Sequence, residues 1–192
     1  MSDSGLDIRL IIAVCVATPK ERQQPHGQQQ LADLRRHGYV IARAEGEDER
    51  QRACDLLNTH VPGLNVGAGD MDGSCITVAR HRRTGAVHAA ADLILHPRDH
   101  GLAGNVARIT ALAVDPEHRG HHLGLAILHE SPRLMRAGSL SMIYGACSED
   151  QAGFYARGGY AVMRPGQMLD FPGGVRALNP NTEVPCWFYR HP

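Results

Sequence analysis

Apolar residues recur along most of the chain at spacings of two, or of three and four, which predicts alternating strands and helices. Residues 39–44 are predicted to form a strand, and residues 47–60 carry apolar side chains at helical spacing until Pro62. Residues 74–80 and 86–95 flank a short polar turn. That arrangement is typical of an antiparallel hairpin, so one helix and three strands are predicted in this part of the chain.

The middle of the chain continues with a strand over residues 106–114, which Asp115 and Pro116 end. An apolar helix begins at about Leu123, and Pro132 is predicted either to kink it or to stop it. Residues 140–146 are the next predicted strand.

The C-terminal part begins with residues 148–151, whose S-x-x-Q pattern is a capping box and predicts the start of a helix. Gly158 and Gly159 are predicted to end that helix. Residues 160–163 and 184–190 are predicted strands on either side of a loop rich in glycine and proline. The order of elements predicts one mixed α/β sheet.

The N-terminal segment is less regular. Residues 6–17 resemble a strand, residues 19–30 are polar and read as a linker, and residues 28–36 are predicted to be a short helix. We therefore predict an N-terminal extension over residues 1–38 and a single domain over residues 39–192.

Composition restricts the class of protein. The 20 basic and 20 acidic residues cancel, so no field of one sign attracts nucleic acid or an anionic membrane. The 5 cysteines are widely spaced without a CxxC pair, which argues against a secreted disulfide framework. The strongest apolar run, residues 10–17, is too short to cross a bilayer. We expect a soluble cytoplasmic protein, with nucleic acid and membrane disfavoured as partners.

Residues 114–126 carry the most specific chemistry. A buried-looking strand leads into a turn at Arg119 and Gly120, and a helix opens at Leu123 and Gly124. Free backbone N–H groups and the positive end of the helix dipole then point at one place, which suits a pyrophosphate.

This segment resembles the acyl-CoA pyrophosphate loop of the GNAT acyltransferases, Q/R-x-x-G-x-G/A, with Arg119 and Gly124 at its first and last fixed positions. Gly120 matches a common family variant. His122 stands in place of the central glycine, where its side chain could donate a hydrogen bond to the phosphates or crowd them.

A second segment, residues 148–160, resembles the family's N-x-x-A-x-x-F-Y-x-x-x-G-F pattern. The resemblance implies that Phe154 packs in the core, that Gly159 ends the helix, and that Tyr155 protonates the leaving CoA thiolate. It covers roughly residues 39–192.

The resemblance implies a GNAT fold, in which a mostly antiparallel sheet flanked by helices has two splayed central strands, here residues 107–114 and 140–146. Acetyl-CoA would be the acyl donor, with its pantetheine between those strands, and no metal is expected. The implied cofactor-binding residues are Leu112, Ala113, Val114, Arg119, Gly120, His121, His122, Leu123, Gly124 and Ser148.

The general base stays open. Many relatives carry a glutamate in the fourth strand, where this chain has Thr110, with the cationic Arg108 nearby. The candidates for the base are Asp92, His88, Glu149 and water.

Three other groups of residues have a functional and a structural interpretation. Four histidines could ligate a metal, but without a carboxylate or cysteine among them we read them as solvated residues. Cys147 is a nucleophile or a small residue at a strand end, and the aromatic run near the C-terminus either packs the last strand or lines an acceptor pocket. The histidines are His118, His121, His122 and His129, and the aromatic residues are Trp187, Phe188 and Tyr189.

The predicted function is transfer of an acetyl group from acetyl-CoA to a primary amine of a small molecule or peptide. The alternatives are a non-catalytic acyl-CoA-binding regulatory module and a toxin that acetylates aminoacyl-tRNA. The toxin requires a basic RNA-binding surface, for which the sequence offers a small cluster at Arg80, Arg82 and Arg83. A homodimer is left open.

Overall fold

The computed structural model describes residues 27–67, 74–96, 105–134 and 140–191. The predicted strand over residues 6–17 lies outside the described residues. Helix α1 begins at Gly27, so residues 27–30 of the predicted linker are helical.

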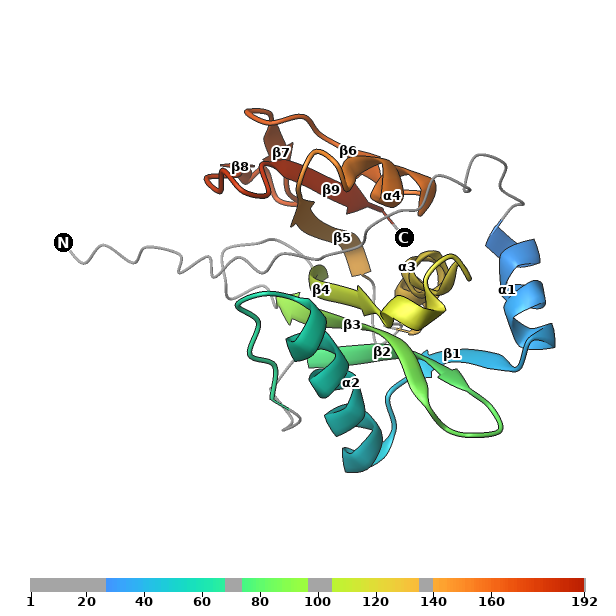
Figure 1. Ribbon diagram of the computed structural model, residues 1–192. Helices are drawn as coiled ribbons and strands as arrows, with labels where there is room; N and C mark the ends of the chain where they lie inside the picture. Colours follow the sequence, from blue (N-terminus) through green and yellow to red (C-terminus); the bar gives the residue numbers. More distant parts are fainter. Residues whose placement is uncertain (1–26, 68–73, 97–104, 135–139, 192) are drawn as a thin grey trace.

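The centre of the molecule is a seven-stranded sheet with the order β1-β2-β3-β4-β5-β9-β6 (Figure 1). Neighbouring strands are antiparallel except for β4 and β5, which are parallel. The predicted mixed, mostly antiparallel sheet is therefore confirmed. Its strands are β1 (Tyr39–Arg43), β2 (Ser74–His81), β3 (Val87–His96), β4 (Asn105–Val114), β5 (Leu140–Cys147), β6 (Ala161–Val162) and β9 (Cys186–Arg190).

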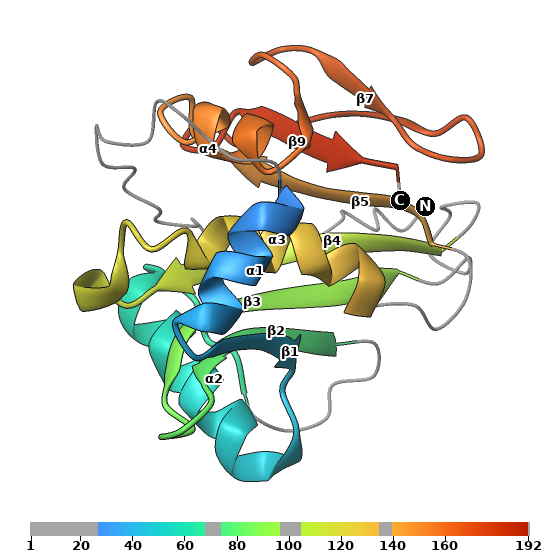
Figure 2. The same cartoon turned by 90° about the vertical axis from the view of Figure 1, so that its right-hand side faces the viewer.

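Helices cover both faces of the sheet. Side chains alternate between the faces along each strand, so each face carries apolar residues that a helix buries. On β3, Ala90 packs with the residues of α2, whereas Ala89 and Ala91 pack with the residues of α3 and α4. Helix α1 lies over α3 and beside β1 (Figure 2). The helices are α1 (Gly27–Arg36), α2 (Gly46–His60), α3 (Leu123–Leu134) and α4 (Ala152–Arg157).

Helix α1 packs on the same core as the sheet, since Leu31 and Leu34 are buried in the cluster that contains the α3 residues. The proposed division of the chain at residue 38 stays a prediction.

A small second sheet follows β6 where the sequence predicted only a loop. Strands β7 (Met168–Asp170) and β8 (Arg176–Leu178) form an antiparallel hairpin. Strands of three residues are too short to show a recognisable alternation. The hairpin is held by Leu169, which is 1% exposed and packs in a cluster with Tyr144 and Trp187.

Helix α4 begins later than predicted. The capping box is only half formed, because the Ser148 N–H donates to Gln151 Oε1 at 3.3 Å while residues 149–151 form a turn. The helix starts at Ala152 without a side-chain cap. A turn makes the same local hydrogen bond as a first helical turn, so this pattern could not separate the two.

Helix α3 runs through Pro132 to Leu134 and does not stop at the proline. A proline in a helix has no N–H to donate to the carbonyl four residues earlier, which here belongs to Leu128. The Tyr160 hydroxyl donates to that carbonyl oxygen at 3.4 Å. A side chain from beyond α4 thus replaces the missing backbone hydrogen bond.

We expect Tyr160→Phe to lower the free energy of unfolding by about 1 kcal/mol, because the buried Leu128 carbonyl loses its donor. In a Pro132→Ala background the new backbone N–H can take that carbonyl, so the cost of Tyr160→Phe should largely vanish. Urea unfolding of the four proteins of this cycle measures the coupling. Equal costs in both backgrounds would contradict the assignment.

Candidate active site

The two central strands separate part-way along their length. Strands β4 and β5 pair only from Asn105↔Leu140 to Arg108↔Tyr144. Beyond that pair β4 continues beside β3 to Val114, while β5 continues beside β9. The predicted splay of the central strands is therefore confirmed, and we call the space between their C-terminal halves the fork.

Beyond Arg108, the backbone of β4 presents to the fork polar groups that have no strand partner within the described residues. The Asp115 N–H donates to His88 O on β3 at 2.8 Å, and backbone groups alternate sides along a strand. The N–H and C=O groups of Val114 and Leu112 therefore point away from β3 and toward the fork, whereas those of Ala113 point to β3. Of the three cofactor-binding residues predicted on this strand, two therefore present their backbone groups to the fork.

A β-bulge lies where the strands part. Leu93 on β3 opposes Ile109, and Asp92 opposes Ala111, so Thr110 is the extra residue of β4. An inserted residue bends the strand and re-aims side chains. The bulge thus coincides with the fork.

The bulge brings the Thr110 hydroxyl onto the Asp92 carboxylate. The hydroxyl donates to Oδ2 of Asp92 and lies 3.2 Å from its backbone oxygen, and the Ser74 hydroxyl donates to Oδ1 at 2.9 Å. Asp92 is 4% exposed and forms no ion pair within the described part of the chain. The site therefore contains a buried carboxylate held by hydroxyl groups alone.

The predicted pyrophosphate loop connects β4 to α3 through the 3₁₀ helix η2 (Pro116–His118). The first hydrogen bond of α3 runs from the Ala126 N–H to His122 O. The N–H groups of Leu123, Gly124 and Leu125 therefore have no partner within the helix and can bind a ligand. Gly120 and His122 have positive φ values of 82° and 58°. His122 holds that strained conformation without the freedom of glycine, and its Nδ1 atom is buried without a hydrogen-bond partner.

Arg119 and Gly124, the fixed ends of the loop motif, both have structural contacts. The Arg119 Nε donates to Val114 O at 3.4 Å. A Cβ added at Gly124 would lie 3.1 Å from the Phe154 ring and 3.4 Å from Leu112 Cδ2. Glycine is needed here because the start of α3 packs closely on both β4 and α4.

A cavity of about 630 Å³ opens between α1 and the loop. Three predicted cofactor residues, Gly120, His121 and His122, line it together with Arg36 at the end of α1 and His37 just after it. The helix before β1 thus forms part of the surroundings of the loop.

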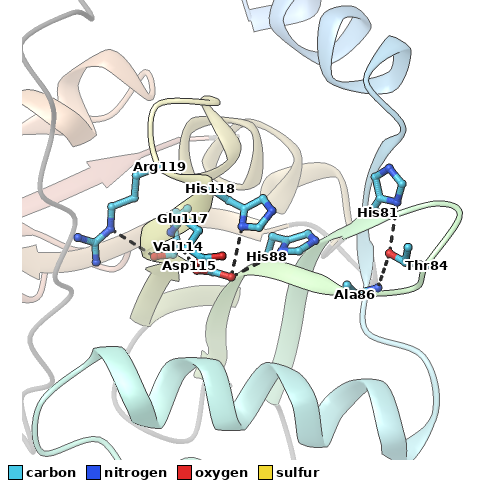
Figure 3. A network of polar contacts seen from close by, with 9 residues as sticks. All are labelled: His81, Thr84, Ala86, His88, Val114, Asp115, Glu117, His118 and Arg119. Carbon is cyan, nitrogen blue, oxygen red and sulfur yellow. Dashed lines mark hydrogen bonds and ion pairs between the residues drawn. The ribbon is translucent and has the colours of Figure 1, made fainter.

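A cluster at the end of β4 joins His88, Asp115 and His118 (Figure 3). Oδ2 of Asp115 lies 3.3 Å from Nδ1 of His118 and 3.7 Å from Nδ1 of His88, while Oδ1 accepts the Glu117 N–H. Burial raises the pKa of Asp115, but the Glu117 N–H and the two histidines outweigh burial and lower it. Burial lowers the pKa of His88, and the neighbouring His118 lowers it further.

The ligand atoms of this cluster lie within 4.8 Å of one another, so its composition fits a metal ion. The rings of His88 and His118, however, are stacked at 3.6 Å with an interplanar angle of 26°. The lone pairs of the two rings therefore lie in nearly parallel planes, a poor arrangement for two imidazole ligands of one ion. We interpret the cluster as a charged contact between Asp115 and the two histidines at the end of β4. From the sequence, His118 was grouped with the nearby His121, His122 and His129. No sequence motif linked it to His88, which lies on another strand.

Tyr155, the predicted acid, is 1% exposed and lies face to face with Phe188 of β9, with ring centroids 3.7 Å apart. Phe188 in turn covers Gly145 of β5, where an added Cβ would lie 2.3 Å from the ring. Phe154 is buried in the core as the resemblance implied, and Gly159 has a φ of 84° just after α4. Tyr155 is thus fixed against the β5 side of the fork.

Ser148 follows β5 directly, and its backbone N–H is held by Gln151. Cys147 before it is fully buried, and burial raises the pKa of its thiol to about 12. A nucleophile must be a thiolate, so the structural reading of Cys147 is the one that fits.

Comparison with known families agrees with this geometry. Residues 28–160, more than half of the chain, match the model of the acetyltransferase (GNAT) family. The chain belongs to the acetyltransferase (GNAT) family. The enzyme class predicted from the two sequence motifs, a GNAT-family N-acetyltransferase, is thereby confirmed.

Solved structures share the GNAT fold at low sequence identity. Glucosamine-6-phosphate N-acetyltransferase from Arabidopsis thaliana has a TM-score of 0.53 and 19% identity over 69% of this chain and 97% of that chain. The Drosophila melanogaster polyamine N-acetyltransferase, which forms N-acetylagmatine, has a TM-score of 0.52 and 17% identity over 80% of this chain and all of its own. A Mycobacterium tuberculosis protein in complex with CoA has a TM-score of 0.50 and 24% identity over 66% of this chain and 74% of its own.

No curated protein matches the chain. Among the described residues, no helix has the length and apolar character needed to span a bilayer. The individual cofactor-binding and catalytic residues stay predictions.

We expect the free energy of unfolding to fall as the pH drops from 7 to 5. Because the pKa of His88 is lowered from 6.5, protonation favours the unfolded chain in this range. The lowered pKa of Asp115 acts in the same direction only below its ordinary value of 3.8. Urea titrations should show a smaller loss for His88→Gln than for the unsubstituted protein. His121→Gln, exposed in the loop, is the control, and an equal loss in all three would contradict the role of His88.

Proposed function

We propose that this GNAT enzyme transfers an acetyl group from acetyl-CoA to a primary amine of a small molecule or peptide. The observation that carries the proposal is the fork. It exposes backbone N–H groups of Leu112 and Val114 along one wall and leads directly to the open N-terminus of α3. An extended amide chain with a pyrophosphate at one end fits both features.

The residues then have separate tasks. The N–H groups at the start of α3, with the Arg119 side chain, bind the pyrophosphate, and the Leu112 and Val114 backbone holds the pantetheine. N–H groups in a strand edge can also stabilise the oxyanion of the reacting thioester. Tyr155 donates a proton to the departing thiolate when the new C–N bond has formed and the C–S bond breaks.

We propose that Thr110 and Asp92 act together as the general base. The acceptor ammonium must lose a proton before attack, and the Thr110 hydroxyl can take it while passing its own proton to the Asp92 carboxylate. Three observations support this proposal: the hydrogen bond between the two side chains, the burial of the carboxylate, and its position at the bulge beside the fork.

The names of the structural neighbours indicate acceptors to try. The Arabidopsis enzyme is named for glucosamine 6-phosphate and the Drosophila enzyme for polyamines. A bacterial neighbour from Escherichia coli is named for the alanine of ribosomal protein S18. A non-catalytic acyl-CoA-binding module, favoured by the strained His122 in the loop, is the competing function.

We expect acetyl-CoA to bind at one site per chain in a calorimetric titration, and thiol to be released when an amine is added. The panel is glucosamine 6-phosphate, agmatine, spermidine, an aminoglycoside and a peptide with N-terminal alanine. Tyr155→Phe should lower kcat by about 10- to 100-fold with little change in the dissociation constant of acetyl-CoA. Absence of binding would overturn the proposal, and binding without thiol release for every amine would favour the non-catalytic module.

Asp92→Asn and Thr110→Val should each lower kcat about 100-fold, because neither can pass the acceptor's proton onward. Thr110→Ser keeps the hydroxyl and should retain most of the activity. Thr77→Val is the matched control, because Thr77 is also a buried threonine of the sheet. It follows Ile76, the residue of β2 opposite Asp92, and therefore faces the other side of the sheet. Full activity of Asp92→Asn would exclude the relay, whatever the effect on stability.

A further inference from the structure

Arg108 lies at the last pair of residues before the fork opens, opposite Tyr144 of β5. Its neighbours on β4, Ala107 and Ile109, point into the core on the α3 side of the sheet. Because side chains alternate along a strand, Arg108 points to the opposite face. Tyr144 lies on that face, packed with Phe171 and Trp187.

The guanidinium of Arg108 is near the Tyr144 ring. Burial raises the pKa of the Tyr144 hydroxyl, and the positive charge of Arg108 opposes that rise. The two residues therefore interact electrostatically across the mouth of the fork.

Within the described residues, the Arg108 charge has no counter-charge. Its Nε atom is buried without a hydrogen-bond partner, and no carboxylate of the described chain lies within ion-pair distance. Arg80, by contrast, is paired with Glu49 at 2.7 Å. The side chain as a whole is half-buried, so the remaining guanidinium N–H groups can reach a ligand, and a buried charged donor such as Nε is usually paired with an anion.

We propose that Arg108 binds an anionic group, a carboxylate or a phosphate, carried by the acceptor amine. This inference rests on the proposed acetyl transfer and names the class of its acceptor. Guanidinium groups bind both kinds of anion through parallel N–H donors, so the shared chemistry is an anionic oxygen group.

The second charged group of this face supports the assignment. Asp92 opposes Ala111 and Ile94 opposes Arg108 on the same pair of strands, so Asp92 and Arg108 lie on one face only a short way apart. They nevertheless do not pair with each other. An acceptor with an ammonium and an anionic group complements both: its amine lies toward the Thr110–Asp92 pair and its anion toward Arg108.

The proposal can be tested with pairs of acceptors that differ only in whether they carry the anionic group. Arginine and agmatine differ by a carboxylate, and glucosamine 6-phosphate and glucosamine differ by a phosphate. We expect the anionic member of at least one pair to have the higher kcat/KM, by about 10-fold or more, as a charge-assisted contact provides. A preference for arginine identifies the carboxylate, and a preference for glucosamine 6-phosphate identifies the phosphate.

Substitution of the arginine separates its role from that of the rest of the site. Arg108→Gln should abolish the preference, mainly through the KM of the anionic acceptor, with an unchanged dissociation constant for acetyl-CoA. Arg108→Lys should retain part of it, and Arg164→Gln, exposed on the loop after β6, is the control. Equal kcat/KM within both pairs for the unsubstituted enzyme, or a preference that survives Arg108→Gln, would overturn the inference. Failure of acetyl-CoA to bind would instead overturn the proposed function.

Discussion

The site depends on the loss of hydrogen bonding between β4 and β5 beyond Arg108 and Tyr144. A sheet gains stability from continuous pairing, and unpaired strand edges within a fold need other partners. Here β5 takes β9 as its second partner and β4 keeps β3, so in the described residues the Leu112 and Val114 N–H groups on the edge that faces the fork have no strand partner. These groups are what a chain of amides such as pantetheine can bind.

The fork is held open by packing on both sides of it. On one wall the Thr110 bulge bends β4, and on the other Phe188 lies between Tyr155 and Gly145. At the open end, Gly124 lets the start of α3 approach both β4 and Phe154 of α4. Closely packed side chains therefore flank the fork on both walls and at its open end.

Sequence reasoning predicted the order of elements and the loop because these depend on local patterns. The run from Val114 to Gly124 combines strand formers, a turn and a helix start, and each signal extends over neighbouring residues. The Asp92–Thr110 pair and the His88–Asp115 contact depend on strand register, which no local pattern contains. The β7–β8 hairpin was missed because its strands are too short. Whether the helix continues past Pro132 stayed open in the sequence, because the hydrogen bond that replaces the lost one comes from the distant Tyr160.

The neutral overall charge, which argued against polyanionic partners, conceals an uneven distribution at the fork. A buried carboxylate, Asp92, and a half-buried guanidinium, Arg108, lie on the same face without pairing, whereas Glu49 and Arg80 form a direct ion pair on the same side of the sheet. Separated opposite charges cost more than a paired set when no ligand is present. A ligand that is positive at one end and negative at the other offsets both charges at once. With the roles proposed for Asp92 and Arg108, the fork would favour an amino acid or an amino sugar phosphate over a simple polyamine, whose charges all have one sign.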